Sequence, residues 1–368
     1  MRARTTDWAL ALGVGLAFAT GLWSLTAGRP DQWWIVALHG AGGLLVALLL
    51  VPKLRRVWPR VWPREPRAWL GLLSSVLALL VVATGVAWTA GGSLVLLGYH
   101  LLNWHILFGY ALTAVVSLHM LARARPLRRA DLAGRRQALS MALLLAGAAA
   151  LWPLKGAAVA WLGLPGARRR FTGSRAWAHF TGNGFPVVSW VADRPRPADP
   201  ALWRLRVDGL VAHPLALDLA ALGRPDELDA TLDCTGGFYT TQRWAGCRVG
   251  ALLDRAGADP SATWVRFVSV TGYRWSLPLQ QARDALVATH VGGEPLAHGH
   301  GAPARLVAPG ERGFVWVKWL TRIELRDQPD PGQLLAINTS WLSPAGRGEG
   351  TWLPDEGGPP GPEDRSRL

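Results

Sequence analysis

Five long apolar runs fill the first half of this 368-residue chain, and no other feature limits its fold as strongly. Each run has roughly the ~20 apolar residues that an α-helix needs to cross the hydrocarbon core of a membrane. No clean small-residue cleavage site follows the first run, so we interpret it as a retained helix and not as a signal peptide. The predicted spanning helices are Trp8–Ala27, Trp33–Val51, Ala68–Ala90, Tyr99–Leu121 and Ala138–Leu162.

Basic residues gather in alternate connections between these runs and account for most of the formal net charge of +14. They precede the first run and follow the second and fourth, whereas Gly91–Gly98, after the third run, carries no charge. The positive-inside rule places the basic connections in the cytoplasm. We therefore interpret these charges as determinants of membrane topology and exclude a surface that binds nucleic acid. Residues from about Gly163 onward then lie outside the cytoplasm, which predicts a multi-pass protein of a bacterial inner membrane.

Histidines are the main polar residues inside the predicted spans, and an ionisable residue at membrane depth indicates function. His39 and His105 each lie six residues into the second and fourth runs, which both run inward from the outer face. This matched depth predicts that the two imidazoles are axial ligands of one haem b. The alternative is that these histidines only form hydrogen bonds between helices.

A third histidine, His119, raises the question of a second haem. It lies fourteen residues beyond His105, which is about 21 Å along a helix and nearly on the same face. This spacing resembles that of the haem-ligating helices of b-type cytochromes. The corresponding position of the second run is Lys53 and not a histidine. A second haem ligated by His119 and a purely structural His119 therefore both stay open.

The chain changes character after residue 162 and predicts an α+β domain rich in β-strands. Short strand-like runs include Trp203–Val207, Thr263–Val270 and Phe314–Leu325, with short helices between them. The residues after Asp327 are rich in Pro and Gly and predict a disordered tail. The sequence therefore predicts a multidomain protein with a transmembrane helical domain at 1–162, an outer domain at 163–327 and a tail at 328–368.

Only two cysteines occur in the chain, and both lie in the stretch LDCTGGFYTTQRWAGC. A thiolate is a soft ligand for a metal, and the glycine pair after Cys234 lets backbone approach a bulky group. The segment ATLDCTGGF…RWAGCRVGALLDRAG resembles the core of the sulfite oxidase family of molybdopterin enzymes. Two further blocks, TGYRWSLPLQQARDALVATHVGGEPLAHGHGAPARLVAPG and GFVWVKWLTRIEL, resemble the same family in the same order.

The resemblance implies a Mo-molybdopterin cofactor, oxygen-atom transfer and a set of site residues. In the family the matching cysteine is the protein thiolate on molybdenum, a role that falls to Cys234. The other implied site residues are Tyr273 and Arg243 beside the substrate, and His300, Arg305, Lys318 and Asn183 around the pterin. The alternatives are a buried inert thiol at Cys234, a turn-packing Tyr273 and a surface ion-pair network at His300 and Arg305.

The sequence departs from sulfite oxidases directly after the cysteine. Phe238 and Tyr239 stand where sulfite oxidases place basic residues, so we predict a neutral, sulfoxide-like substrate. The whole chain resembles a molybdopterin reductase for oxidised protein methionine joined to its haem b membrane protein. We expect electrons to pass between the quinone pool and the outer domain through the haem. The alternatives are a sulfite oxidase that feeds the membrane, a non-catalytic electron carrier, and a transporter-like five-helix protein without haem.

Overall fold

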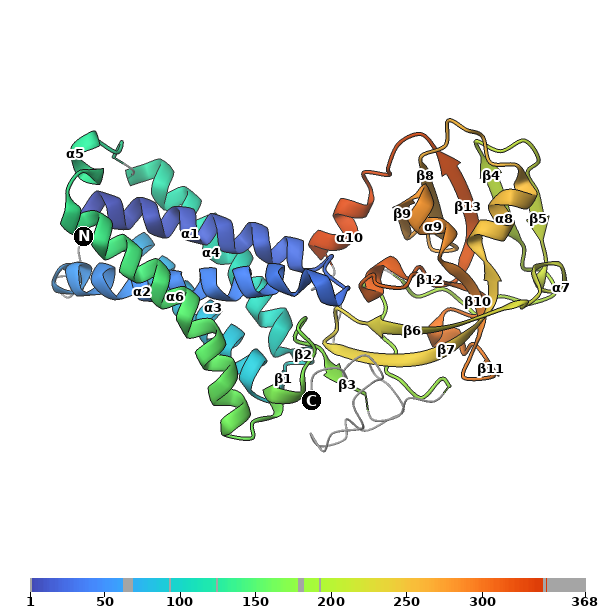
Figure 1. Ribbon diagram of the computed structural model, residues 1–368, viewed down its shortest axis with the longest axis horizontal. Coiled ribbons are helices and arrows are strands. Elements are labelled where there is room, and N and C mark those ends of the chain that lie inside the picture. The colour runs from blue at the N-terminus through green and yellow to red at the C-terminus, as the bar shows by residue number, and fades with distance from the viewer. Residues whose placement is uncertain are drawn as a thin grey trace. The chain divides into compact units, whose positions relative to one another are not determined.

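The computed structural model describes residues 2–61, 69–92, 94–123, 125–177, 182–191, 193–339 and 342. The chain divides into two compact units, Met1–Gly173 and Ser174–Leu368. The first unit consists mainly of long helices and the second of sheets with short helices (Figure 1). The first is called the helical unit and the second the outer unit.

The helical unit contains five helices that are long and apolar enough to cross a membrane, which confirms the predicted all-α membrane part of the fold. In the second of these helices Pro52 and Pro59 lie inside the helical range. Many of the large apolar side chains point outward, as they do where lipid is the solvent; Leu143 is 72% exposed and Trp161 is 85% exposed. The predicted first residue of the third run, Ala68, lies outside the described residues. The five helices are α1 (Ala3–Ser24), α2 (Trp33–Val61), α3 (Trp69–Ala90), α4 (Leu101–Arg123) and α6 (Arg135–Trp161).

The helices of this unit pack in consecutive pairs, α1 against α2 and α3 against α4, and α6 packs on α2. A small hairpin of β1 (Val95–Leu96) and β2 (Tyr99–His100) joins α3 to α4. The short helix α5 (Arg129–Leu132) precedes α6, and the 3-10 turn η2 (Pro165–Arg168) follows it. The first histidine-bearing helix, α2, and the second, α4, therefore each pack against the helix that precedes them.

The outer unit contains two sheets, and the mixture of strands and short helices confirms the predicted α+β class. The six-stranded sheet consists of β3 (Arg175–Ala176), β6 (Asp226–Asp233), β7 (Phe238–Arg248), β10 (Leu286–Val291), β11 (Glu294–Pro295) and β12 (Arg305–Val307). The five-stranded sheet consists of β4 (Leu205–Gly209), β5 (Leu215–Leu217), β8 (Trp264–Ser269), β9 (Arg274–Pro278) and β13 (Leu320–Arg326). The helices are α7 (Leu219–Leu222), α8 (Val249–Ala256), α9 (Leu279–Arg283) and α10 (Gln333–Thr339). One large apolar core includes side chains from both sheets.

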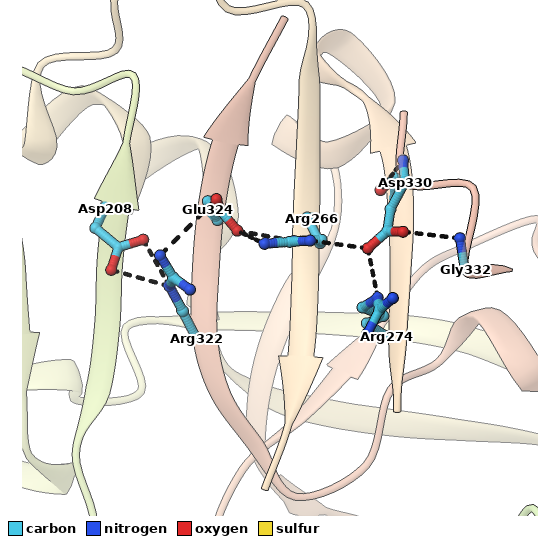
Figure 2. Close-up of polar contacts among 8 residues, drawn as sticks. Asp208, Arg266, Arg274, Arg322, Glu324, Asp330 and Gly332 are labelled. Carbon is cyan, nitrogen blue, oxygen red and sulfur yellow. Dashed lines mark hydrogen bonds and ion pairs between the residues drawn. The ribbon is translucent and has the colours of Figure 1, made fainter. Parts of the chain in front are cut away.

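A row of charged side chains crosses the five-stranded sheet and holds the chain beyond its last strand (Figure 2). Arg266 on β8 pairs with Glu324 on β13 and, at 2.9 Å, with Asp330. Asp330 is only 3% exposed and also pairs with Arg274 on β9. This row ties residue 330, which lies in the predicted tail, to the sheet, and α10 follows it. The rest of the predicted tail, from residue 343, lies outside the described residues.

Candidate functional site

Cys234 lies in the tight connection between β6 and β7, the longest antiparallel pair of the outer unit. Its backbone N–H donates to the carbonyl of Phe238 at 2.8 Å, and its carbonyl accepts from Gly237, which has a φ of 91°. The backbone N–H of Gly236 points at the Cys234 Sγ from 3.3 Å, and a side chain at Gly236 would place Cβ 3.4 Å from that sulfur. The glycine pair of the sequence motif therefore builds the close turn that presents the sulfur.

Three cationic side chains lie within electrostatic range of this sulfur: Lys318, Arg305 and Arg312. Lys318 and Arg305 come from separate segments that meet at Gly301, where an added Cβ would lie 3.0 Å from the Cβ of Lys318 and 3.1 Å from that of Arg305. The Lys318 ammonium donates to the carbonyls of Val188 and Gly299. The structure therefore brings together three of the residues that the sequence predicted for the site.

Arg305 is buried against aromatic rings and is not neutralised by a carboxylate among the described residues. It is 1% exposed, its guanidinium lies 5.2 Å from the ring centroid of Trp244, and it donates to the carbonyls of His300 and Trp316. Its Nε has no hydrogen-bond partner within the described part of the chain. A buried, incompletely satisfied guanidinium is a site that an anion with several oxygen acceptors stabilises.

His300 is the third member of this basic group and is 2% exposed. Its ring lies on Phe185 with centroids 3.8 Å apart, and its Nε2 lies 3.0 Å from the carbonyl oxygen of Asn183. Asn183 therefore touches the site through its backbone, because its side-chain amide bonds Glu294 and Pro295 instead. The Nδ1 of His300 has no partner among the described residues, so this ring can still donate or accept one hydrogen bond.

Burial shifts the pKa values of the titratable side chains in this group. Desolvation, with repulsion from Arg305, lowers the pKa of Lys318 to about 7. Desolvation, followed by repulsion from Lys318 and Arg305, lowers the pKa of His300 to about 3. Burial raises the pKa of the Cys234 thiol, while the neighbouring Lys318 and Arg312 act in the opposite direction. A bound anion would oppose the lowering of both pKa values, because it favours the charged forms of Lys318 and His300.

Tyr273 is also held at the site, and it accompanies a carboxyl group that the sequence did not reveal. Its hydroxyl donates to the carbonyl of Phe314 at 2.6 Å, and its ring lies 5.9 Å from that of Trp190. Asp193 interacts electrostatically with both Tyr273 and Lys318, and burial raises the pKa of this carboxyl. Its Oδ1 has no partner among the described residues. Asp193 stands in an irregular loop, where no periodic pattern could mark it.

One residue predicted for the substrate side lies elsewhere. The side chain of Arg243 is 63% exposed and pairs with Asp229 on β6 at 3.2 Å, so the structure does not bring it to the group around Cys234. Phe238 and Tyr239, which begin β7, are both buried, and the ring of Phe238 packs against that of Trp177. The neutral substrate pocket inferred from these two residues stays a prediction.

In the helical unit, His39 and His105 face one another across a cavity of about 370 Å³. Their ring centroids are 5.9 Å apart. Two imidazoles that bind one metal ion from opposite sides, each at about 2 Å, have ring centroids roughly 6 Å apart. The Nδ1 of His39 lies 2.9 Å from the Ala17 carbonyl oxygen, and that of His105 lies 2.9 Å from the carbonyl oxygen of Val81. Both rings are thereby oriented with Nε2 left for a ligand, as in metal-binding histidines.

Small residues give both imidazoles their room. An added Cβ at Gly21 would lie 3.0 Å from Cε1 of His39, and one at Gly85 would lie 2.9 Å from Cε1 of His105. The two helix pairs therefore share one arrangement. In each, a backbone carbonyl of the preceding helix orients the histidine ring, and the glycine four residues after that carbonyl leaves space for the ring. His119 is not among the described residues that line the cavity. At the position equivalent to His119, Lys53 forms an ion pair with Asp7 at 2.6 Å.

Comparison with known proteins identifies the outer unit. Residues 192–334 match the family model of the oxidoreductase molybdopterin binding domain. The uncharacterised oxidoreductase YuiH of Bacillus subtilis is 33% identical over 153 residues, which are 40% of this chain and 77% of YuiH. The outer unit is therefore a molybdopterin-binding oxidoreductase domain.

Two further relatives specify the family. The protein-methionine-sulfoxide reductase catalytic subunit MsrP of Gluconobacter oxydans is 32% identical over 154 residues, 36% of this chain and 49% of MsrP. Mouse mitochondrial sulfite oxidase is 32% identical over 183 residues, 40% of this chain and 32% of that enzyme. The chain thus spans half or less of the length of these two relatives. It belongs to the sulfite oxidase family of molybdopterin-binding oxidoreductases, and the family match begins beyond the helical unit.

Proposed function

We propose that this protein is a membrane-anchored molybdenum enzyme that reduces sulfoxide-like substrates outside the cytoplasm of a bacterium. The observation that carries the proposal is the buried sulfur of Cys234 beside the buried cations Lys318 and Arg305. A molybdopterin contributes an anionic phosphate and two sulfur donors, and this site offers basic side chains and a thiol for them. When bound, the cofactor supplies the two-electron oxygen-atom transfer chemistry.

The residues present fit this cofactor by their chemistry. Arg305 and His300 each retain a nitrogen without a partner among the described residues, and both suit phosphate oxygens. Cys234 is the single protein thiol beside them, and its turn is built by glycines that let a bulky group approach. Arg305, His300 and Lys318 would hold the pterin, and Tyr273 would border the substrate. Arg243 is exposed, so we assign it no part in this site.

The likeness to MsrP supports a sulfoxide as substrate. Reduction of a sulfoxide consumes two electrons and two protons and releases a sulfide and water. The buried carboxyl of Asp193, whose pKa is raised, lies within electrostatic range of Tyr273 and Lys318 and is suited to hold a proton there. The equal likeness to sulfite oxidase makes sulfite the competing substrate, with electrons flowing in the opposite direction.

We further propose that the helical unit binds one haem b between His39 and His105 and passes electrons from membrane quinol to the outer unit. The separation of the two rings and the orientation of both Nδ1 atoms toward carbonyls support an iron ligated by the two Nε2 atoms. The ion pair of Lys53, the position on α2 equivalent to His119, with Asp7 supports a single haem. The basic cytoplasmic connections support an outer unit on the extracytoplasmic side.

Metal analysis and substrate competition on the detergent-purified chain test these proposals together. We expect stoichiometric molybdenum and pterin in the wild type, loss of turnover by orders of magnitude in Cys234→Ser, and little change in Cys247→Ser. Cys247 is the matched control because it is the other buried free cysteine. Methionine sulfoxide should reoxidise quinol-reduced haem, whereas sulfite should not reduce it. Rapid sulfite oxidation without sulfoxide turnover would reverse the substrate assignment, and a folded outer unit without molybdenum would leave only an electron carrier.

A further inference from the structure

The segment that follows the last spanning helix lines the histidine cavity with positive charge. Residues Arg169 to Gly173 all contribute to the cavity that His39 and His105 face. The preceding turn η2 packs closely on the end of α3, where a Cβ on Gly166 would lie 2.1 Å from the carbonyl oxygen of Thr89. Residues 169–173 therefore form one wall of the proposed haem cavity.

Both arginines of the wall are held in place by backbone carbonyls. The guanidinium of Arg169 lies 4.3 Å from the ring centroid of Trp88 and donates to the carbonyl of Gly91 at 2.9 Å. Arg170 donates to the carbonyl of Gly28 at 3.2 Å. These contacts anchor two guanidinium groups from a segment without regular secondary structure.

The charges lining the cavity have one sign. Lys155, whose ammonium lies 4.1 Å from the ring centroid of Trp152, joins Arg169 and Arg170 as a third cationic lining residue. Among the described residues that line the cavity, none is an aspartate or a glutamate. The rest of the lining is mainly apolar. A ligand that fits must therefore be largely apolar and carry acidic groups at one edge.

We infer that Arg169 and Arg170 bind the carboxylates of the haem that His39 and His105 hold. This inference rests on the haem of the proposed function and extends it to the side chains that fix the edge of the macrocycle. A planar guanidinium can bind a carboxylate through two parallel hydrogen bonds, which an ammonium cannot reproduce. The arginines thus set both the orientation of the haem and the positive charge near its iron.

The sequence provides a matched control beside the two arginines. Arg168 precedes them directly, is exposed and is not among the residues that line the cavity. The variants Arg168→Gln, Arg169→Gln and Arg170→Gln each remove one positive charge from the same short segment. Arg170→Gln is the cleaner of the two cavity variants, because Arg170 donates to the Gly28 carbonyl at 3.2 Å, whereas Arg169 donates at 2.8 and 2.9 Å to the carbonyls of Gly173 and Gly91. Arg169→Lys keeps the positive charge and removes the planar guanidinium, which can donate two parallel hydrogen bonds.

The experiment compares the full-length variants by haem content, haem release and midpoint potential, with normal haem and with haem whose two carboxylates are methyl esters. We expect Arg170→Gln to release haem several-fold faster and to shift its midpoint potential to more negative values, because a lost cation disfavours the reduced iron. Arg169→Gln should behave likewise, Arg169→Lys should be intermediate, and Arg168→Gln should match the wild type. With the ester haem, the difference between Arg170→Gln and the wild type should disappear.

Each outcome separates the inference from the function on which it rests. If the wild type shows no haem absorbance, the haem of the proposed function fails and the inference falls with it. If haem binds but Arg168→Gln and Arg170→Gln have equal release rates and potentials, the inference alone is overturned. A difference that persists unchanged with the ester haem also overturns it, because the arginine then acts on something other than the carboxylates. Should Arg169→Gln fail to fold, Arg170→Gln decides alone.

Discussion

The hydroxyl of Ser174 donates a hydrogen bond to Oδ1 of Asp233, 2.6 Å away, in the residue directly before Cys234. The same carboxylate forms an ion pair with Arg312 at 3.4 Å. Asp233 is 1% exposed and Arg312 is 3% exposed, so this pair lies in the interior beneath the candidate molybdenum ligand. The position of the sulfur therefore depends on a buried ion pair and not only on the glycine turn.

Removing Arg312 should destabilise the outer unit strongly. Arg312→Leu leaves the carboxylate of Asp233 buried without its cation, which typically costs about 3–5 kcal/mol. Arg243→Leu is the control, because its pair with Asp229 is exposed and such pairs contribute about 0.2–1 kcal/mol. Thermal unfolding of the full chain in detergent, followed by near-ultraviolet circular dichroism, measures both. Equal losses in the two variants would show that the Asp233–Arg312 pair has no special role.

Deleting individual histidines should define the number of haems. We expect His39→Ala and His105→Ala each to abolish the haem absorbance, because the two rings face one cavity 5.9 Å apart. His119→Ala should retain the full haem content, because Lys53 and Asp7 occupy the equivalent position of the other helix pair. Haem quantification per chain checks both expectations. Half the haem content in His119→Ala would instead establish a second site.

Glycine substitution within one helix tests the packing around a proposed ligand. An added methyl group at Gly21 would lie 3.0 Å from Cε1 of His39, so Gly21→Ala should lower haem occupancy severalfold or alter the haem spectrum. Gly15→Ala lies on the same helix and meets no atom within 4 Å, so it should leave the haem unchanged. Both substitutions raise helix propensity by the same ~0.8–1.0 kcal/mol, so the comparison isolates the contact. Identical spectra and occupancies in the two variants would contradict the assignment.

The depth of the histidines was predictable from sequence because helix geometry fixes the rise per residue. Counting from Trp33 and Tyr99 places His39 and His105 at one level, and in the structure both rings line one cavity with their centroids 5.9 Å apart. Their hydrogen bonds to Ala17 and Val81 were not predictable, because they depend on how each helix is rotated against its neighbour. Spacing along one helix cannot determine that rotation.

In the outer unit, sequence motifs located the residues that share the site but not their orientation. The loop bearing Lys318 and the strand bearing Arg305 meet at Gly301, which agrees with the shared pterin-binding role that the family resemblance implies for the two residues. Arg243 shows the limit of this reasoning, because a motif carries no information about which face of a strand a residue occupies. Its neighbours Gln242 and Trp244 are buried, so strand alternation turns Arg243 outward. Asp193 and Arg312 could be found only through long-range contacts.

Lys318 should make the stability of the cofactor-free protein depend on pH. In the folded chain, burial lowers the pKa of Lys318 to about 7, whereas an exposed lysine in the unfolded chain has a pKa of about 10.4. Between these two values the unfolded state binds one more proton than the folded state. The free energy of unfolding must therefore rise as pH increases from about 7 to about 10, by at most about 1.4 kcal/mol per pH unit from this one group.

Lys318→Met has no ammonium to titrate. Its free energy of unfolding should therefore rise less steeply with pH than that of the wild type between pH 7.5 and 9.5. This range lies within the roughly 7–10 window set by the two pKa values of the lysine. The comparison of slopes is needed because the variant also loses the hydrogen bonds to Val188 and Gly299, an effect that does not depend on pH. Asp193→Asn removes the carboxylate that raises the pKa of Lys318, so it should extend the steep region below pH 7. Denaturant unfolding of the three cofactor-free proteins at several pH values measures these slopes. Parallel curves for the wild type and Lys318→Met would mean that Lys318 keeps its charge in the folded state without an anion, and the basic group would then not be the strained anion site argued above.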